Sequence, residues 1–239
     1  LDTGAMRPIL RFDSRIAGPR WSPDGKTVAF LSGNMSQGFP GGDVFTVPAT
    51  GGTPVNRMGD RKSSVGWIHW LSPEKLLVTE HLDGGSAIST LDLESGRFDT
   101  LWQGQEWVHG GRGVPNFSLA ADGRSGAVIR HSWEQPPEIW VGPAGRWRQV
   151  THLNSEQRPA WGRATSIHWH NEGFQVQGWL LYPRDYSPER RYPLVVCVHG
   201  GPAFVSKPAW PGPSLDVTAL SGAGYFVFLP NPRGSYGQG

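Results

Sequence analysis

The sequence is poor in cysteine, in net charge and in long apolar runs, and each shortage excludes a class of protein. Cys197 is the only cysteine among 239 residues, so no internal disulfide can form. The formal net charge is only +2 and the basic residues are scattered, whereas a nucleic-acid partner needs a clustered cationic face. No stretch approaches the roughly 20 apolar residues of a membrane span. We therefore expect neither a nucleic-acid nor a membrane partner.

The start of the chain and its cysteine bear on the compartment. Leu1–Gly4 has neither an initiating Met nor the charged-then-apolar pattern of a secretion signal. The expected location is cytoplasmic, and a leader upstream of Leu1 stays open. Cys197 lies in the apolar run Leu194–Val198, which predicts a buried small side chain rather than a reactive thiol.

Glycine, proline and aromatic residues are abundant. The chain has 33 Gly, 21 Pro, 12 Trp and 10 Phe, without a Gly-X-Y period or a low-complexity run. Gly and Pro supply the φ values that tight turns require, and disordered chains are poor in aromatics. This composition predicts a folded protein of short strands joined by tight turns.

A turn motif recurs along the first two thirds of the chain. Trp21–Lys26, Leu71–Lys75 and Leu119–Arg124 start 50 and 48 residues apart, and each precedes a short apolar run. Each instance is typical of strand, tight turn and strand. Four short strands per unit of about 40–50 residues indicate β-propeller blades. A β-sandwich with similar hairpins is the alternative. About three blades fit before residue 155, fewer than the roughly 4–8 of closed propellers.

The pattern changes after the polar stretch Leu153–Pro159. Two short strands are expected at 165–169 and 176–182, and the apolar runs Pro193–Val198 and Tyr225–Leu229 predict strands that are buried on both faces. A short helix over Ser214–Ala223, with Leu215 and Leu220 turned inward, would connect the two apolar strands. This order indicates an α/β sheet.

A glycine-rich loop follows the first apolar strand. His199-Gly200-Gly201-Pro202 is either a simple turn or a loop that presents backbone N–H groups to a cleft. In α/β-hydrolases a loop of this kind supplies one of the two N–H donors that stabilise the oxyanion of acyl transfer.

Three segments carry a specific resemblance. Residues 179–183, 192–202 and 224–239 resemble, in the correct order, the opening of the catalytic domain of the prolyl oligopeptidase family of serine peptidases, and within it the acylaminoacyl peptidase and dipeptidyl peptidase group. The resemblance implies C-terminal blades of a β-propeller over residues 1–158 and the incomplete start of an α/β-hydrolase domain over residues 159–239. It also implies that Gly201 N–H is an oxyanion-hole donor, with Gly200 and His199 supporting the loop. Arg233 would hold a structural ion pair.

The family's nucleophile is missing from the sequence. No Gly-x-Ser-x-Gly pentapeptide occurs. Ser235 has Arg233 where the first Gly should stand, and Ser125 lies in a propeller turn. We expect the catalytic Ser, Asp and His to lie beyond Gly239, and this chain alone to be inactive.

The resemblance implies a function for the intact protein. It would hydrolyse short peptides through an acyl-enzyme, with no cofactor and no metal, as a possible homo-oligomer. Two alternatives stay open: an esterase on the same platform, and a non-enzymatic propeller module that binds a partner and carries a vestigial hydrolase segment.

Other reactive-looking residues have simpler interpretations. His168 and His170 lie on one face of a strand, where a solvated face is favoured over a zinc site. Position alone assigns no substrate contact to Glu156 or Glu172. Five tryptophans are expected in the core between blades rather than in a ligand cage: Trp102, Trp107, Trp133, Trp140 and Trp147.

Overall fold

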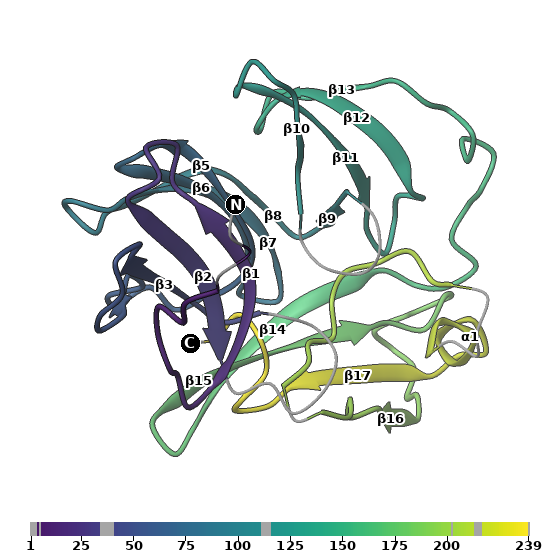
Figure 1. Cartoon of the computed structure of the whole chain (residues 1–239). Coiled ribbons are helices and arrows are strands. Elements are labelled where there is room, and N and C mark those ends of the chain that lie inside the picture. Colours follow the sequence, from purple (N-terminus) through teal and green to yellow (C-terminus); the bar gives the residue numbers. More distant parts are fainter. Residues whose placement is uncertain are drawn as a thin grey trace.

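The computed structural model describes residues 4, 6–33, 41–110, 116–201, 203–212 and 217–238. These residues form four β-sheets and one short helix (Figure 1). No helix among the described residues is long and apolar enough to cross a membrane. Pro202 of the glycine-rich loop and Leu215 of the expected helix lie outside the described residues.

Three consecutive antiparallel sheets occupy the first two thirds of the chain, and the four main strands of each lie in chain order. Sheet A contains β1 (Arg15–Trp21), β2 (Thr27–Gly33), β3 (Asp43–Pro48) and β4 (Val55–Asn56). Sheet B contains β5 (Ser64–Ser72), β6 (Lys75–Leu82), β7 (Gly85–Asp92) and β8 (Phe98–Gly104). Sheet C contains β10 (Ser118–Leu119), β11 (Ser125–His131), β12 (Glu138–Pro143), β13 (Arg148–Gln149) and the additional β9 (Trp107–His109), which pairs with β11.

The recurring motif forms the first hairpin of each sheet. Gly25 and Gly123 have φ of 69° and 66°, a conformation that Gly adopts at little cost. Asp122 Oδ1 accepts the N–H groups of Arg124 and Ser125, each at 2.9 Å. The Asp122 side chain therefore closes the turn formed at Asp122-Gly123. The hairpins predicted at the recurring motif are present.

Apolar side chains fill the spaces between neighbouring sheets. The cluster between sheets A and B includes Leu31, Val44 and Ile68, each at most 2% exposed. The cluster between sheets B and C includes Leu77, Val108 and Val128, and three of the five tryptophans pack against it: Trp102, Trp140 and Trp147.

Of the two other tryptophans, Trp107 of sheet C packs against sheet B as predicted, whereas Trp133 lies elsewhere. Trp133 packs with Trp179 and Leu181 in the core of the fourth sheet, and its carbonyl accepts the indole N–H of Trp161 at 2.9 Å. Trp107 stacks on His81, with ring centroids 5.2 Å apart. The sequence predicted that the tryptophans are buried, but not which sheets each of them packs against.

Sheet D is mixed and lies below sheets B and C in Figure 1. Its order is β14 (Ala164–Asn171), β15 (Phe174–Leu181), β17 (Phe226–Asn231) and β16 (Leu194–Val196). β16 and β17 are parallel, and α1 (Val217–Gly222) lies on the connection between them. Leu220 packs against the core of sheet D, as predicted.

The prediction that the run Pro193–Val198 is buried on both faces is wrong. Leu194, Val196 and Val198 are 57%, 53% and 66% exposed. In the part of the chain that the structure describes, β16 pairs with β17 alone, at the edge of sheet D, and Leu194 and Val196 lie on a face that no described element covers. Cys197 points to the other face, packs against the core and is half-buried rather than buried.

Candidate active-site loops

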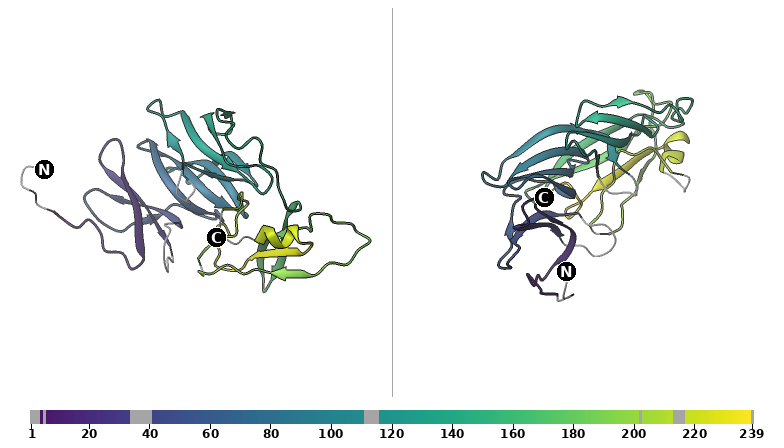
Figure 2. Two further views of the ribbon diagram at one scale, coloured as in Figure 1. Left: turned by 90° about the vertical axis from the view of Figure 1, so that its right-hand side faces the viewer. Right: turned by 45° about the horizontal axis from the view of Figure 1, so that its top comes forward.

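The two parallel strands of sheet D end at the same edge and each is followed by a loop. β16 leads to His199–Gly201, and β17 leads to the turns at Pro232–Gln238. The carboxyl ends of parallel strands are where ligands bind in open α/β sheets. Figure 2 shows this end of sheet D turned toward the other sheets, with the C-terminal segment between them.

His199 joins the two loops. Its Nδ1 lies 3.0 Å from the Gly200 carbonyl, which can only accept a hydrogen bond, so this nitrogen carries the proton. Its Nε2, 3.0 Å from Ser235 Oγ, then accepts the hydroxyl proton. Ser235 is 3% exposed, and Phe204 packs on the imidazole with centroids 5.5 Å apart. These contacts are those of a residue that supports the loop. A catalytic role for His199 stays a prediction.

Gly201 occupies a conformation that other residues rarely adopt. Its φ is +152°, and a Cβ there would lie 2.8 Å from the Ala203 nitrogen. At Gly200, by contrast, a Cβ would meet nothing within 4 Å. Of the two neighbouring glycines, only Gly201 is therefore required by the local backbone. That its N–H faces an oxyanion stays a prediction.

A buried amide network fixes the chain behind this loop, and sequence reasoning missed it. Asn231, fully buried at the end of β17, donates to Gln177 Oε1 at 2.7 Å and to the Ser206 carbonyl at 3.0 Å. Its Oδ1 accepts the Ser206 N–H at 2.6 Å. Gln177 in turn donates to Ser166 Oγ at 2.9 Å. The signal was available, because a polar side chain that ends an apolar strand must find partners when buried.

Replacing Asn231 by alanine should lower the free energy of unfolding by about 3 kcal/mol, because it removes the acceptor of the Ser206 N–H and the donor to the Ser206 carbonyl and to the buried Gln177 Oε1. Denaturant unfolding measures this change. Asn171→Ala is the matched control, since Asn171 is exposed at the end of β14 and its loss should be within about 0.5 kcal/mol. Equal effects of the two substitutions would contradict the network.

The loop after β17 is also held by sheet B. Gly237 N–H donates to Ser64 Oγ at 3.0 Å, and the Gly237 carbonyl accepts Asp83 N–H at 3.1 Å. The Tyr236 ring stacks on His81 with centroids 5.6 Å apart. Residues as far as 173 positions apart in the chain thus share one set of contacts, which no local sequence pattern could show.

The remaining sequence candidates lie in ion pairs, on the surface or in other sheets. Arg233 lies 3.8 Å from the Glu172 carboxylate, and both side chains are exposed. His168 Nε2 lies 2.7 Å from Asp83 Oδ1 between sheets D and B, and His170 is exposed. Among the described residues, no three His, Cys, Asp or Glu side chains are grouped to hold a metal. Ser125 begins β11 in sheet C.

Two cavities adjoin the loop after β17. One, of about 430 Å³, has Arg233 and Gly234 on one side and Asp43 and Lys62 on the other. The second, of about 410 Å³, is lined by Ser235 and Tyr236 together with aromatic residues of the N-terminal third, Phe12 and Phe45. Both lie between sheet A and the loop after β17, where a ligand would touch residues of both parts.

Comparison with known proteins gives a consistent group of relatives. No profile of a known protein family matches the sequence. The chain is 25% identical over 234 residues to dipeptidyl-peptidase 5 of Porphyromonas gingivalis, covering 92% of this chain and 32% of that protein. An acylaminoacyl peptidase, solved in complex with Z-Gly-Gly-Phe-chloromethyl ketone, superposes with a TM-score of 0.63 at 18% identity over 90% of this chain and 32% of its own. Dipeptidyl peptidase 4 of P. gingivalis superposes with a TM-score of 0.65 at 14% identity, and the match covers 95% of this chain and 33% of that protein. The chain thus spans about a third of the length of these relatives.

Proposed function

We propose, from the relationship of this chain to the prolyl oligopeptidase family of serine peptidases, that it supplies one side of a peptidase active site. The observation that carries the proposal is the pair of loops at the carboxyl ends of β16 and β17. They are joined by His199 and Ser235, and the loop after β17 lines two cavities beside sheet A. The fold likeness to propeller-containing hydrolases supports the same assignment.

In this proposal, sheets A, B and C are consecutive propeller blades within residues 1–158. Each is an antiparallel sheet with its four main strands in chain order, and apolar clusters fill the spaces between neighbours. Residues 159–239 are the start of an α/β-hydrolase domain. A parallel strand pair with a helix on its connection supports this reading, since parallel strands need such a crossover.

The chemistry proposed is acyl transfer to a serine and hydrolysis of the acyl-enzyme. Gly201 N–H would donate to the carbonyl oxygen as negative charge develops on it, and His199 would keep the loop in the donating conformation. Ser235 and His199 resemble a nucleophile and base only in their distance. Ser235 is buried, and the His199 Nδ1 proton is directed to a carbonyl rather than to a carboxylate that would orient a base.

The proposed substrates are short peptides. Cavities of about 430 and 410 Å³ between sheet A and the loops can take a few residues of extended chain. Their lining combines exposed charges, as at Lys62 and Arg233, with aromatic rings, as at Phe12 and Tyr236.

Expression of the full native reading frame that contains this chain tests the proposal. We expect its product to hydrolyse short peptide amides and to react with a fluorophosphonate that labels active serines. We expect the 239-residue chain alone to do neither. Turnover of esters without any turnover of peptides would show that the protein is an esterase and not a peptidase. Labelling of Ser235 in the chain alone would overturn the structural role given to that residue.

Gly201→Ala should lower kcat about 100-fold in that product, because the added Cβ would displace the N–H from the position where the oxyanion forms. Gly200→Ala, one residue away, should lower it less than threefold, because a Cβ there is unobstructed. Steady-state kinetics with one peptide substrate measures both. Similar losses for the two variants would argue against a specific donor at Gly201.

A further inference from the structure

A group of ring side chains lies where sheets B and C meet the segment that follows the glycine-rich loop. His109 of β9 and His131 of β11 lie on paired strands, with Nε2 atoms 3.2 Å apart. The segment 203–212 reaches them from the other side. The Trp210 backbone N–H donates to His131 Nδ1 at 2.9 Å, and Lys207 Nζ lies 3.7 Å from the centre of the Trp107 ring.

These contacts fix the protonation of His131. Because its Nδ1 accepts the Trp210 N–H, this nitrogen carries no proton, and Nε2 of the neutral ring must carry it. Nε2–H then donates to His109 Nε2, which must also be unprotonated. A second proton on either ring at these nitrogens would place two donors face to face and break one of the two hydrogen bonds.

The charged groups nearby also oppose that proton. From segment 203–212, Lys207 faces both His131 and His81 of β6. His109 of β9 also faces His131. The carboxylate of Glu106 is neutralised by its ion pair with Arg130 at 2.8 Å. Burial lowers the pKa of His131 to about 4, and the charge of Lys207, or a proton on His109, acts in the same direction.

We propose that His131 is a positioning residue that holds segment 203–212 behind the candidate oxyanion loop, and that it does so only in its uncharged form. Segment 203–212 begins two residues after Gly201, and its Phe204 packs on His199. Its Ser206 is bonded to Asn231. Release of Trp210 from His131 therefore loosens the chain that carries the loop. The role in catalysis rests on the proposed function, whereas the hydrogen bond itself does not.

Hydrogen exchange of the Trp210 amide in the 239-residue chain tests the hydrogen bond. Between pH 7 and pH 4.5 its protection factor should fall on the order of 50-fold, since opening lets His131 take up a proton at its ordinary pKa. The Gly162 amide is the reference, because it donates at 2.9 Å to the hydroxyl of Ser221, which does not titrate in this range. Its protection should change less than threefold.

Two substitutions make the result specific. His131→Asn places an amide oxygen near the Nδ1 position, so Trp210 should stay protected and the pH dependence should disappear. His131→Leu removes the acceptor, and protection should be lost at both pH values. Wild-type protection that is equal at both pH values, or a pH dependence that persists in His131→Asn, would overturn the proposal.

The positioning role is measured separately in the product of the native reading frame. His131→Leu should lower kcat at pH 7 at least tenfold, and His131→Asn should restore it and move the acid limb of the kcat profile to lower pH. His170→Asn, at an exposed position, should behave as wild type. An unchanged kcat in His131→Leu would overturn the positioning role. Because the exchange experiment needs no turnover, it separates failure of this inference from failure of the peptidase assignment.

Discussion

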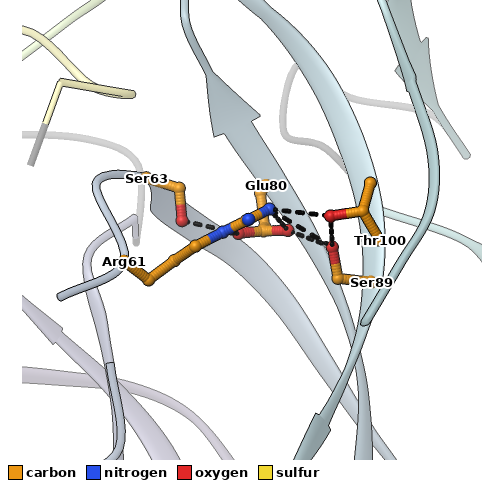
Figure 3. Close-up of polar contacts among 5 residues, drawn as sticks. All are labelled: Arg61, Ser63, Glu80, Ser89 and Thr100. Atoms are coloured by element: carbon orange, nitrogen blue, oxygen red, sulfur yellow. Dashed lines mark hydrogen bonds and ion pairs between the residues drawn. The ribbon is translucent and has the colours of Figure 1, made fainter. Parts of the chain in front are cut away.

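Replacing Glu80 by alanine is expected to lower the free energy of unfolding by about 4 kcal/mol. Glu80 is completely buried in β6, and Figure 3 shows how its carboxylate is surrounded. Arg61 donates to both oxygens, at 2.9 and 3.0 Å. Ser63 and Ser89 donate their hydroxyl protons to the carboxylate at 2.6 and 2.5 Å. Alanine would leave the guanidinium and two hydroxyls largely buried without the acceptor around which they are arranged.

The size of the effect comes from the unpaired charge rather than from the ion pair itself. The Arg61 side chain is only 21% exposed, so it cannot regain full hydration. Removing one partner of a buried pair costs roughly 3–5 kcal/mol, whereas replacing both partners by apolar residues is often neutral. Arg61→Met combined with Glu80→Leu should therefore recover at least half of the loss seen with Glu80→Ala.

Denaturant unfolding of the three proteins provides the measurement. The pair Arg97–Asp99 supplies a control in the same sheet, with side chains 71% and 44% exposed. Asp99→Ala should not change the stability measurably, since exposed ion pairs contribute little. A loss for Glu80→Ala no larger than for Asp99→Ala would show that the buried carboxylate is not charged or not central to the network.

The network also matters for the candidate site. It fastens the segment between β4 and β5 to sheet B, and this segment brings Asp60 and Lys62 to the larger cavity. Ser64, which starts β5, accepts the Gly237 N–H of the loop after β17. A change at Glu80 can thus reach the loop after β17 through the start of β5 and the Ser64 side chain.

Local patterns predicted the strands well because their signals are local. The hairpins at Asp24-Gly25 and Asp122-Gly123 follow from side-chain closure and positive φ, and both can be read from adjacent residues. The burial of β16 was mispredicted for the opposite reason. Whether an apolar strand is covered depends on its place in the sheet, and the run Leu194–Val198 carries no information on that place.

The candidate site was predictable only in part. The loop at His199–Gly201 could be found from its glycines and its position after a strand. The contact of His199 with Ser235, and that of His131 with Trp210, join residues 36 and 79 positions apart. Such contacts depend on the order of the strands and on packing between sheets. The residues next to either partner in the sequence carry no information on these.

Acidification is expected to destabilise the protein strongly, and His81 should make the largest contribution of any single group described. Its ring is fully buried between those of Trp107 and Tyr236, and its Nδ1 has no hydrogen-bond partner among the described residues. Burial, followed by the positive charge of Lys207, lowers the pKa of His81 to about 3. An aromatic face can stabilise a cation, but Lys207 already lies over the Trp107 ring at 3.7 Å.

The sign of the pH effect follows from proton uptake. Below about pH 6.5 the unfolded chain binds a proton at His81, whereas the folded protein does not until about pH 3. Unfolding therefore takes up a proton in this window, and the stabilisation present above pH 6.5 is lost as the pH falls. At pH 4.5 the loss from this one group is about 2.5 kcal/mol, a large part of a typical folding free energy.

His81→Phe isolates this contribution, because phenylalanine keeps the aromatic stack and removes both the titrating group and the unsatisfied nitrogen. At pH 7 the variant should match or exceed the wild type in stability, and at pH 4.5 it should be more stable by about 2.5 kcal/mol. Urea unfolding at the two pH values gives the difference, in which contributions common to both proteins, such as that of His131, cancel. His170→Phe, at an exposed position, should show no pH-dependent difference. If the two variants respond to pH alike, His81 is not the buried neutral group that holds the loop after β17 against sheet B.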